Sequence, residues 1–316
     1  MRGSTSQSLP FREAPTRARG RPLAEDTPNT AAEADATSGA DGVDLESFAR
    51  LFTIPFEPAK ALVKTLLNTL LHVEVSGAEN IPEEGGGLII CNHTDLIDVP
   101  VQGTYSSRKL LYLGKVELFE PDEQIKRFLY QENSPLNNPM LAPIRPIVET
   151  ALNAYGYAHR IQLYEWGGHP IKRNYRGQSA RAAAKYYQEL EDYIVGLLKE
   201  GKFISIFPEG TRTETGVMQP FKALAARLAI RAGVPIVPSG ISGAYRFSRM
   251  ESILSGQIFR TRINYNIGKP IMPTEFPEGD EKKASKELTA ILEKQVYALT
   301  LHPERRDHGR GKARVL

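Results

Sequence analysis

The sequence predicts an α/β fold with a mixed, mainly parallel sheet and helices on both of its faces. Strand-like apolar runs alternate with helix-like segments through most of the 316 residues, which is the pattern of a layered α/β domain. The run 88–91 ends abruptly in polar residues, and the run 203–206 leads through Phe207 and Pro208 to a cluster of polar and charged residues. Because a buried strand that ends this way exposes side chains at the edge of the sheet, we expect the functional residues there.

The composition excludes several classes of site and partner. The single cysteine, Cys91, excludes an intramolecular disulfide and a multi-cysteine metal site, and it fits a reducing compartment. The formal net charge of +3 is too small to argue for a nucleic-acid partner. The six histidines are scattered without His-x-x-x-His spacing, so we predict no metal site.

The two ends of the chain differ from its centre. Residues 1–43 contain few large apolar side chains, which predicts a disordered N-terminal tail, and they contain no apolar h-region, which argues against secretion. Residues 302–316 form a basic C-terminal tail. This tail fits attraction to an anionic membrane surface, and it fits a solvated tail equally well.

Residues 44–72 are the most apolar helical candidate. They lack the 18 or so uninterrupted apolar residues that a spanning helix needs, and Pro55 and Pro58 interrupt them. We interpret the segment as a broken amphipathic helix in the membrane interface. The alternative is a helix that packs on the domain core.

The elements of the central domain, residues 73–301, follow in order. We predict strands at 73–77, 88–91, 109–113, 203–206, 234–238 and 259–267, and helices after residue 98, from Ser179 to Gly201, from 220 to Gly233, and at 284–301. Ser179 is a predicted N-cap and Gly233 a predicted stop. Residues 120–165 are rich in proline and show no clear period. They are a lid, a docking element for a donor or membrane, or an irregular insertion.

The first polar strand end contains a histidine and an aspartate. Asn92 and His93 follow the strand, and Asp98 comes five residues after His93. An aspartate at this spacing can reach one ring nitrogen, fix the tautomer and leave the other nitrogen free to take a proton. Taken alone, the pair is more often a helix cap and a surface acid. Cys91 ends the apolar run, so a structural thiol is favoured over a nucleophile.

The second polar strand end is residues 207–212, Phe-Pro-Glu-Gly-Thr-Arg. Together with Asn92, His93 and Asp98, it resembles the glycerolipid acyltransferases of the lysophosphatidic acid acyltransferase type. In that family the His and Asp carry catalysis and the second motif helps bind the glycerophosphate acceptor. The resemblance therefore implies catalytic residues His93 and Asp98, and the substrate-binding residues Glu209, Gly210, Thr211 and Arg212.

Weaker matches add two cations to the substrate-binding set. Arg173 stands where the family has an acceptor-binding arginine, although it is equally one charge of a basic loop. Lys115 lies in a region where the family has a basic residue near the acceptor phosphate, and a surface lysine is the alternative. The family usually has serine at the position of Asp95 and glycine at that of Leu224, and these departures bear on substrate choice more than on chemistry.

The resemblance implies an activity with named partners. The expected reaction is transfer of a fatty acyl group from a thioester, acyl-CoA or acyl carrier protein, to a lysophospholipid hydroxyl without another cofactor. The expected acceptor is 1-acyl-sn-glycerol 3-phosphate, which gives phosphatidic acid in phospholipid biosynthesis at the cytoplasmic face of a membrane. Glycerol 3-phosphate or a lyso-aminolipid is the alternative acceptor. A catalytically silent lipid-binding protein is the third hypothesis, and the intact His–Asp pair argues against it.

Overall fold

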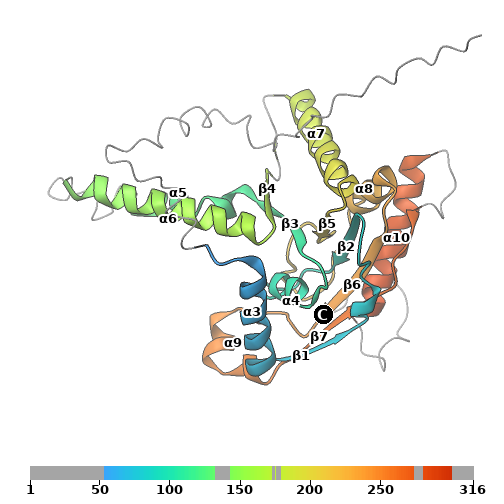
Figure 1. The fold of residues 1–316 in the computed structure, drawn as a ribbon, viewed down its shortest axis with the longest axis horizontal. Helices are drawn as coiled ribbons and strands as arrows, with labels where there is room; N and C mark the ends of the chain where they lie inside the picture. The colour runs from blue at the N-terminus through green and yellow to red at the C-terminus, as the bar shows by residue number, and fades with distance from the viewer. Residues whose placement is uncertain (1–52, 132–142, 173–174, 176–178, 274–279, 301–316) are drawn as a thin grey trace, which may run out of the picture.

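The computed structural model describes residues 53–131, 143–172, 175, 179–273 and 280–300 (Figure 1). The predicted disordered tail, residues 1–43, lies outside these ranges, as do the basic tail and Arg173. Those three predictions are therefore not addressed by the structure.

A single seven-stranded sheet forms the centre of the described domain, with strand order β1-β7-β6-β2-β5-β3-β4. Neighbouring strands are parallel except for the antiparallel pair β6 and β7. The strands are β1 (His72–Ser76), β2 (Gly87–Cys91), β3 (Leu110–Lys115), β4 (Gly168–Ile171), β5 (Phe203–Ile206), β6 (Ile236–Ser242) and β7 (Arg262–Ile267). The prediction of a mixed, mainly parallel sheet is confirmed.

Helices cover both faces of this sheet (Figure 1). In chain order they are α3 (Phe56–Leu70), α4 (Asp98–Tyr105), α5 (Pro121–Leu129), α6 (Arg145–Glu165), α7 (Ala180–Lys199), α8 (Leu224–Ala232), α9 (Met250–Leu254) and α10 (Glu281–Leu299). Side chains of α7, α8 and α10 pack in one apolar cluster, and those of α3 and α4 pack in another. The sheet lies between the two clusters, as the α/β prediction requires.

Strand β2 shows why helices pack on both faces of the sheet. Leu88 and Ile90 point into the α7–α8–α10 cluster, whereas Ile89 and Cys91 point into the α3–α4 cluster, and all four are fully buried. A strand buried on both faces reads as a continuous apolar run because alternate side chains serve opposite layers. This burial holds the end of β2, where the polar residues begin, in a fixed place.

Two predicted helix ends are confirmed. The Ser179 hydroxyl accepts a hydrogen bond from the Ala182 backbone N–H at 3.2 Å, which caps α7. Gly233 follows α8 with a φ of 65°, in the left-handed region that a glycine enters without a steric cost. Ser179 therefore begins the helix before β5, and Gly233 ends the helix after it.

Helix α3 continues through Pro58, and residues 44–52 of the predicted segment lie outside the described residues. Pro55 is its N-cap residue and Pro58 falls in its first turn, where no backbone N–H is needed for the helix. One face packs on the core through Ala59 and Leu67. The other face exposes a stripe of leucines at a spacing of four, namely Leu62, Leu66 and Leu70. The alternative of packing on the core describes the first face, and the interfacial interpretation stays a prediction for the second.

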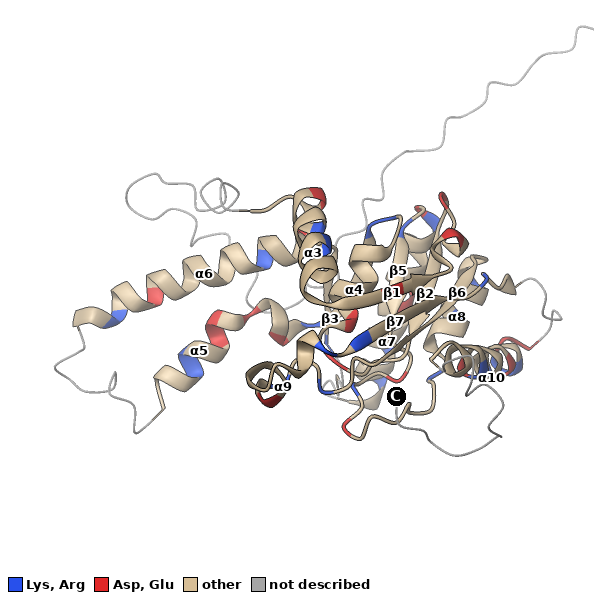
Figure 2. Cartoon of the chain, turned by 90° about the horizontal axis from the view of Figure 1, so that it is seen from below, with Lys and Arg blue, Asp and Glu red and all other residues tan. Residues whose placement is uncertain are grey.

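The stretch 120–165 is largely helical rather than irregular. Helices α5 and α6 lie against each other, and Lys126 donates to the Asn153 side chain at 2.6 Å between them. Figures 1 and 2 show the pair extending as an arm from the body of the domain. Proline stands in the first turn of both helices, so the prolines that hid the helical period begin the helices instead of breaking them.

The connection between β6 and β7 also differs from the prediction. The strand predicted at 259–267 begins at Arg262, and Phe259 lies in a short 3-10 helix, Gln257–Phe259. Helix α9 and strand β4 were not predicted at all. Four- and five-residue elements carry too little periodicity to be recognised from sequence. Of the helices that the structure describes, none is both long and apolar enough to cross a membrane.

Candidate active site

The predicted site residues gather at one edge of the sheet. Strands β2, β5, β3 and β4 are neighbours and parallel, so their carboxyl ends meet at a common edge, where α/β proteins bind ligands. His93 follows β2, Glu209 and Arg212 follow β5, and Lys115 ends β3. Because strands lie about 4.8 Å apart, the end of β3 is about 10 Å from the end of β2.

His93 and Asp98 are in direct contact. The His93 Nδ1 atom lies 2.9 Å from Asp98 Oδ2. Since a carboxylate only accepts hydrogen bonds, this contact places the imidazole proton on Nδ1 and leaves Nε2 as the acceptor nitrogen. The arrangement is that of a base and its orienting acid.

Asp98 is held by several donors besides the histidine. Its Oδ2 atom accepts from the backbone N–H groups of Thr94, at 2.6 Å, and Asp95, at 2.8 Å. Its Oδ1 atom accepts from the Thr94 hydroxyl at 3.1 Å. Asp98 is fully buried and is the first residue of α4, so the positive end of the helix also favours its charge. These contacts fix the carboxylate before any substrate binds.

The imidazole ring is fixed from its face as well. It stacks on the ring of Phe207, with 4.0 Å between ring centroids and 18° between the planes. Its side chain keeps 16% of its surface exposed. A ring that is clamped yet partly open suits a group that exchanges a proton with a substrate.

Glu209 binds the backbone of both polar loops. Its Oε1 atom accepts from the His93 backbone N–H at 2.7 Å, and its Oε2 atom accepts from the Gln219 N–H at 2.7 Å. Burial raises the pKa of Glu209 to about 7, although these two hydrogen bonds oppose the rise. These contacts orient the two loops, whereas the resemblance implies a substrate-binding role for Glu209, which stays a prediction.

The loop after Glu209 is closely packed at its glycine. Gly210 has a φ of 78°, and a β-carbon there would lie 2.5 Å from the Lys222 Nζ atom. Lys222 therefore places an ammonium group on the predicted substrate-binding loop, a contact that sequence reasoning missed because a single lysine there has no signal of its own. Thr211 and Arg212 are exposed, and Arg212 forms no ion pair with any residue of the described ranges.

Strand β6 and the chain after it bind the turn that contains His93. The Asn92 amide exchanges two hydrogen bonds with the Ile241 backbone, donating to its oxygen at 2.9 Å and accepting from its nitrogen at 2.8 Å. Asp95 accepts hydrogen bonds from the Ser248 backbone N–H, at 3.1 Å, and from the Ser248 hydroxyl. The acid that replaces the family's usual serine thus ties the His93 turn to the chain that leads into α9.

Cys91 is remote from solvent. It is fully buried at the end of β2, and burial raises the pKa of its thiol well above the ordinary value, with a further rise from the Asp98 charge. A protonated, buried thiol is a poor nucleophile. The structural interpretation of Cys91 therefore agrees with its surroundings. In the part of the chain that the structure describes, no three His, Cys, Asp or Glu side chains are grouped to hold a metal ion.

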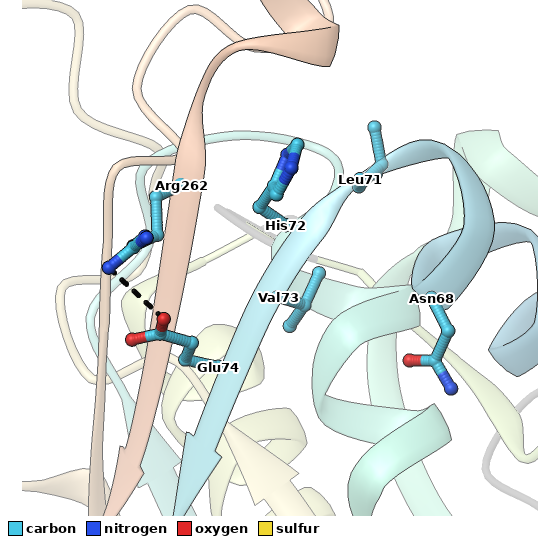
Figure 3. A pocket seen from close by; sticks show the side chains of 6 residues that line it. All are labelled: Asn68, Leu71, His72, Val73, Glu74 and Arg262. Carbon is cyan, nitrogen blue, oxygen red and sulfur yellow. Dashed lines mark ion pairs between the residues drawn. The ribbon is translucent and has the colours of Figure 1, made fainter.

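A pocket of about 320 Å³ lies elsewhere on the same edge of the sheet (Figure 3). Its lining residues are Asn68, Leu71, His72, Val73, Glu74 and Arg262, and an ion pair of 3.1 Å joins Arg262 to Glu74. The pocket shares this edge because β1 and β7 run opposite to β6, so they begin where β6 ends. None of the predicted site residues lines it.

Comparisons with known proteins agree with the geometry. The sequence profile of the family described as acyltransferase matches residues 72–132 and 142–242, about half of the chain. A 1-acyl-sn-glycerol-3-phosphate acyltransferase of Bacillus subtilis is 25% identical over 75% of this chain and 92% of its own length. The Homo sapiens 1-acyl-sn-glycerol-3-phosphate acyltransferase alpha is 47% identical over 28% of this chain and 30% of its own length.

A solved structure is also similar to the chain. It is the crystal structure of the 1-acyl-sn-glycerophosphate (LPA) acyltransferase PlsC from Thermotoga maritima. The alignment covers 78% of this chain and 81% of that chain, at 19% identity and a TM-score of 0.47.

Proposed function

The chain belongs to the acyltransferase family, and we propose that this O-acyltransferase moves a fatty acyl group from a thioester to 1-acyl-sn-glycerol 3-phosphate. The product is phosphatidic acid, and the role is in phospholipid biosynthesis. The observation that carries the proposal is the 2.9 Å contact between His93 Nδ1 and Asp98 Oδ2 at the sheet edge, beside the loop that bears Arg212. The names of the two curated relatives support the choice of acceptor.

His93 is the proposed general base. Its free Nε2 atom takes the proton from the acceptor hydroxyl as that oxygen attacks the thioester carbonyl carbon. The C–S bond then breaks, and the imidazolium returns the proton to the departing thiolate. Asp98 stabilises the imidazolium between the two steps. Ester and thiol form, and no group outside the two substrates is consumed.

Transfer without an acyl-enzyme is the simpler path for this site. An alcohol needs a base to become a good nucleophile at neutral pH, and the His93–Asp98 pair supplies one. The nearest thiol, Cys91, is fully buried and protonated. The donor is proposed to be acyl-CoA or acyl carrier protein, with no further cofactor.

The acceptor phosphate is proposed to bind the cations at the ends of β5 and β3. Arg212 is exposed at the exit of β5 and Lys115 at the exit of β3. A guanidinium suits a phosphomonoester because it stays charged and donates two parallel hydrogen bonds. Arg173 stays in this proposal from the sequence alone, while Gly210 and Thr211 shape the loop.

The enzyme is proposed to act at the cytoplasmic face of a membrane, where its lipid substrate resides. The exposed leucine stripe of α3 supports interfacial binding, because this face has no partner in the domain core. Washing isolated membranes with salt or carbonate should release the protein at least in part. Retention until detergent is added would contradict peripheral attachment.

Product analysis tests the proposed reaction. Purified protein is given a mixture of lysophosphatidic acid, a lyso-aminolipid and glycerol 3-phosphate, with acyl-CoA and acyl carrier protein donors offered separately. Mass spectrometry should find phosphatidic acid as the main product. His93→Ala protein from the same preparation is the control for contaminating activity.

The same assay separates the alternatives. Acylated glycerol 3-phosphate or a diacyl aminolipid as the main product would keep the chemistry and replace the acceptor. Folded protein that binds lysophosphatidic acid but forms no product with either donor would favour the silent lipid-binding hypothesis.

A further inference from the structure

The connection between β6 and β7, residues 243–261, presents apolar side chains outward that the core does not use. Met250, Ile253, Leu254 and Phe259 are all exposed, Leu254 at 80% and Met250 at 66%. Two other residues of the connection face the core, since Phe247 and Ile258 pack into the α3–α4 cluster. The four outward residues, called here the α9 surface, are therefore not needed to hold α9 on the domain.

The charged residues of the connection itself are mainly positive. Residues 243–261 contain Arg246, Arg249 and Arg260, and Glu251 is their only acid. All three arginines are exposed, and among the described residues Arg249 and Arg260 have no ion-pair partner. An apolar centre with a cationic border is the pattern of a surface that rests on anionic lipid. It also opposes a symmetric dimer through this surface, because two positive copies would face each other.

The α9 surface follows the edge of the sheet at which the carboxyl ends of β2 and β5 meet, called here the catalytic edge. β6 ends at Ser242 beside the carboxyl end of β2, and the chain then runs directly to α9. The Ser248 hydroxyl and backbone N–H donate to Asp95, two residues after His93. Figures 1 and 2 show α9 protruding from the body of the domain at this end. A bilayer in contact with α9 would therefore lie next to the His93 turn.

We propose that the α9 surface docks on an anionic lipid bilayer and sets the catalytic edge against the membrane. This surface shares no residue with the leucine stripe of α3 or with the basic tail. The proposal needs only lipid binding and does not depend on the identity of the acceptor, so its test does not use acyl transfer.

A site-specific fluorophore tests the contact directly. The sole cysteine, Cys91, is fully buried, so an environment-sensitive thiol dye labels a new surface cysteine selectively. Leu254→Cys reports on the α9 surface. Ile147→Cys, on the α5–α6 arm, is the matched control because Ile147 is 70% exposed.

The expected result is specific to position and to lipid charge. Vesicles of phosphatidylcholine and phosphatidylglycerol should shift the emission of the dye at position 254 to shorter wavelengths and leave the dye at 147 unchanged. Phosphatidylcholine alone, or high salt, should reduce the shift, since surface charge attraction is screened. An unchanged dye at position 254 when the protein sediments with vesicles would overturn the proposal. A dye at 254 that is already shielded without vesicles would overturn it too, in favour of a second copy or another segment of this chain.

A pair of substitutions gives an independent measure. Met250→Ser with Leu254→Ser should lower the partition coefficient on anionic vesicles by roughly tenfold, because two apolar side chains no longer leave water. Phe128→Ser with Ile147→Ser on the arm is the control and should change little. Thermal unfolding should match the wild type in both, since all four residues are exposed. Equal partitioning of the two double variants would contradict the α9 surface as the docking site.

Discussion

The exits of β2 and β5 lie side by side, and they differ beyond the buried Glu209, which binds the backbone of both. At the β2 exit, the polar side chains of Asn92, Asp95 and Asp98 are buried and hydrogen-bonded within the protein. At the β5 exit, Arg212 is exposed and unpaired within the described ranges, as is Lys115 at the end of β3. The difference fits the proposed mechanism, in which the group that moves a proton is fixed in advance and the exposed cations bind the acceptor phosphate.

The largest effect is expected from the fixed side of this comparison. His93→Ala should lower kcat by about 10² to 10⁴, the usual contribution of a general base. The variant loses the proton acceptor but keeps Asp98 and the loops, so donor binding should persist. Steady-state kinetics with thioester and lysophosphatidic acid measure this, and His72→Ala, an exposed histidine of β1, is the control. A folded His93→Ala protein with a near wild-type kcat would remove the base from the account.

Asp98→Asn should lower kcat comparably or somewhat less. The amide keeps the shape of the side chain but removes the charge that stabilises the imidazolium. It should also lower the unfolding temperature, because the carboxylate accepts four hydrogen bonds or contacts and an amide nitrogen accepts none. Asp95→Asn is the matched control, since it alters the tether to Ser248 and leaves the His93 contact intact. Equal losses of kcat in the two variants would show that turn rigidity, rather than the charge of Asp98, supports the reaction.

The titration of Glu209 should make the stability of the protein depend on pH. Its folded pKa of about 7 is above its ordinary value of 4.5, so the folded chain holds a proton that the unfolded chain releases. The contribution of Glu209 to the free energy of unfolding therefore falls as the pH rises from about 4.5 to about 7. The total fall is at most about 3 kcal/mol, and the contribution then levels off.

Denaturant unfolding at pH 5 and pH 8 measures the Glu209 contribution. The stability difference between the two pH values should be smaller in Glu209→Gln than in the wild type, because the amide does not titrate. An unchanged difference would show that the carboxyl group of Glu209 titrates at its ordinary value in the folded protein.

The smallest effects are expected from substitutions of the cations that are predicted to bind the acceptor phosphate. Arg212→Ala should raise the KM for lysophosphatidic acid roughly tenfold and leave that for the donor unchanged, because a charge-assisted hydrogen bond to phosphate is lost. Arg173→Ala should act alike, and Lys115→Ala less, since the end of β3 is farther from His93. Lys185→Ala on the outer face of α7 is the control. Loss of donor affinity alone would reassign these cations to the thioester.

Local chemistry explains what could be predicted from the sequence. His93 and Asp98 belong to one short turn after a buried strand, so their contact needs no distant partner. Ser179 and Gly233 act on their own helix ends, and each has a specific physical signature. The α/β class follows from strand and helix alternation, which many residues share.

Contacts between distant segments explain what was missed. Asp95 and Ser248 are 153 residues apart, and Glu209 and His93 are 116 apart. Their meeting depends on β6 and β5 lying on either side of β2, and a single sequence does not specify that order. Helices α5 and α6 were missed for a local reason, because the proline-rich stretch 120–165 shows no clear period, whereas Pro121 and Pro146 stand in the first turns of the two helices.

A single-turnover experiment with a labelled acyl thioester tests the central claim, direct transfer assisted by His93. The protein is first mixed with the labelled donor alone, and lysophosphatidic acid is added afterwards, with intact-protein mass spectrometry before and after the addition. The account predicts no acylated protein at either stage, with the label passing into phosphatidic acid only when the acceptor is present and only when His93 is intact. Acylated protein formed from donor alone, at Cys91 or any other residue, and discharged by the acceptor would contradict it.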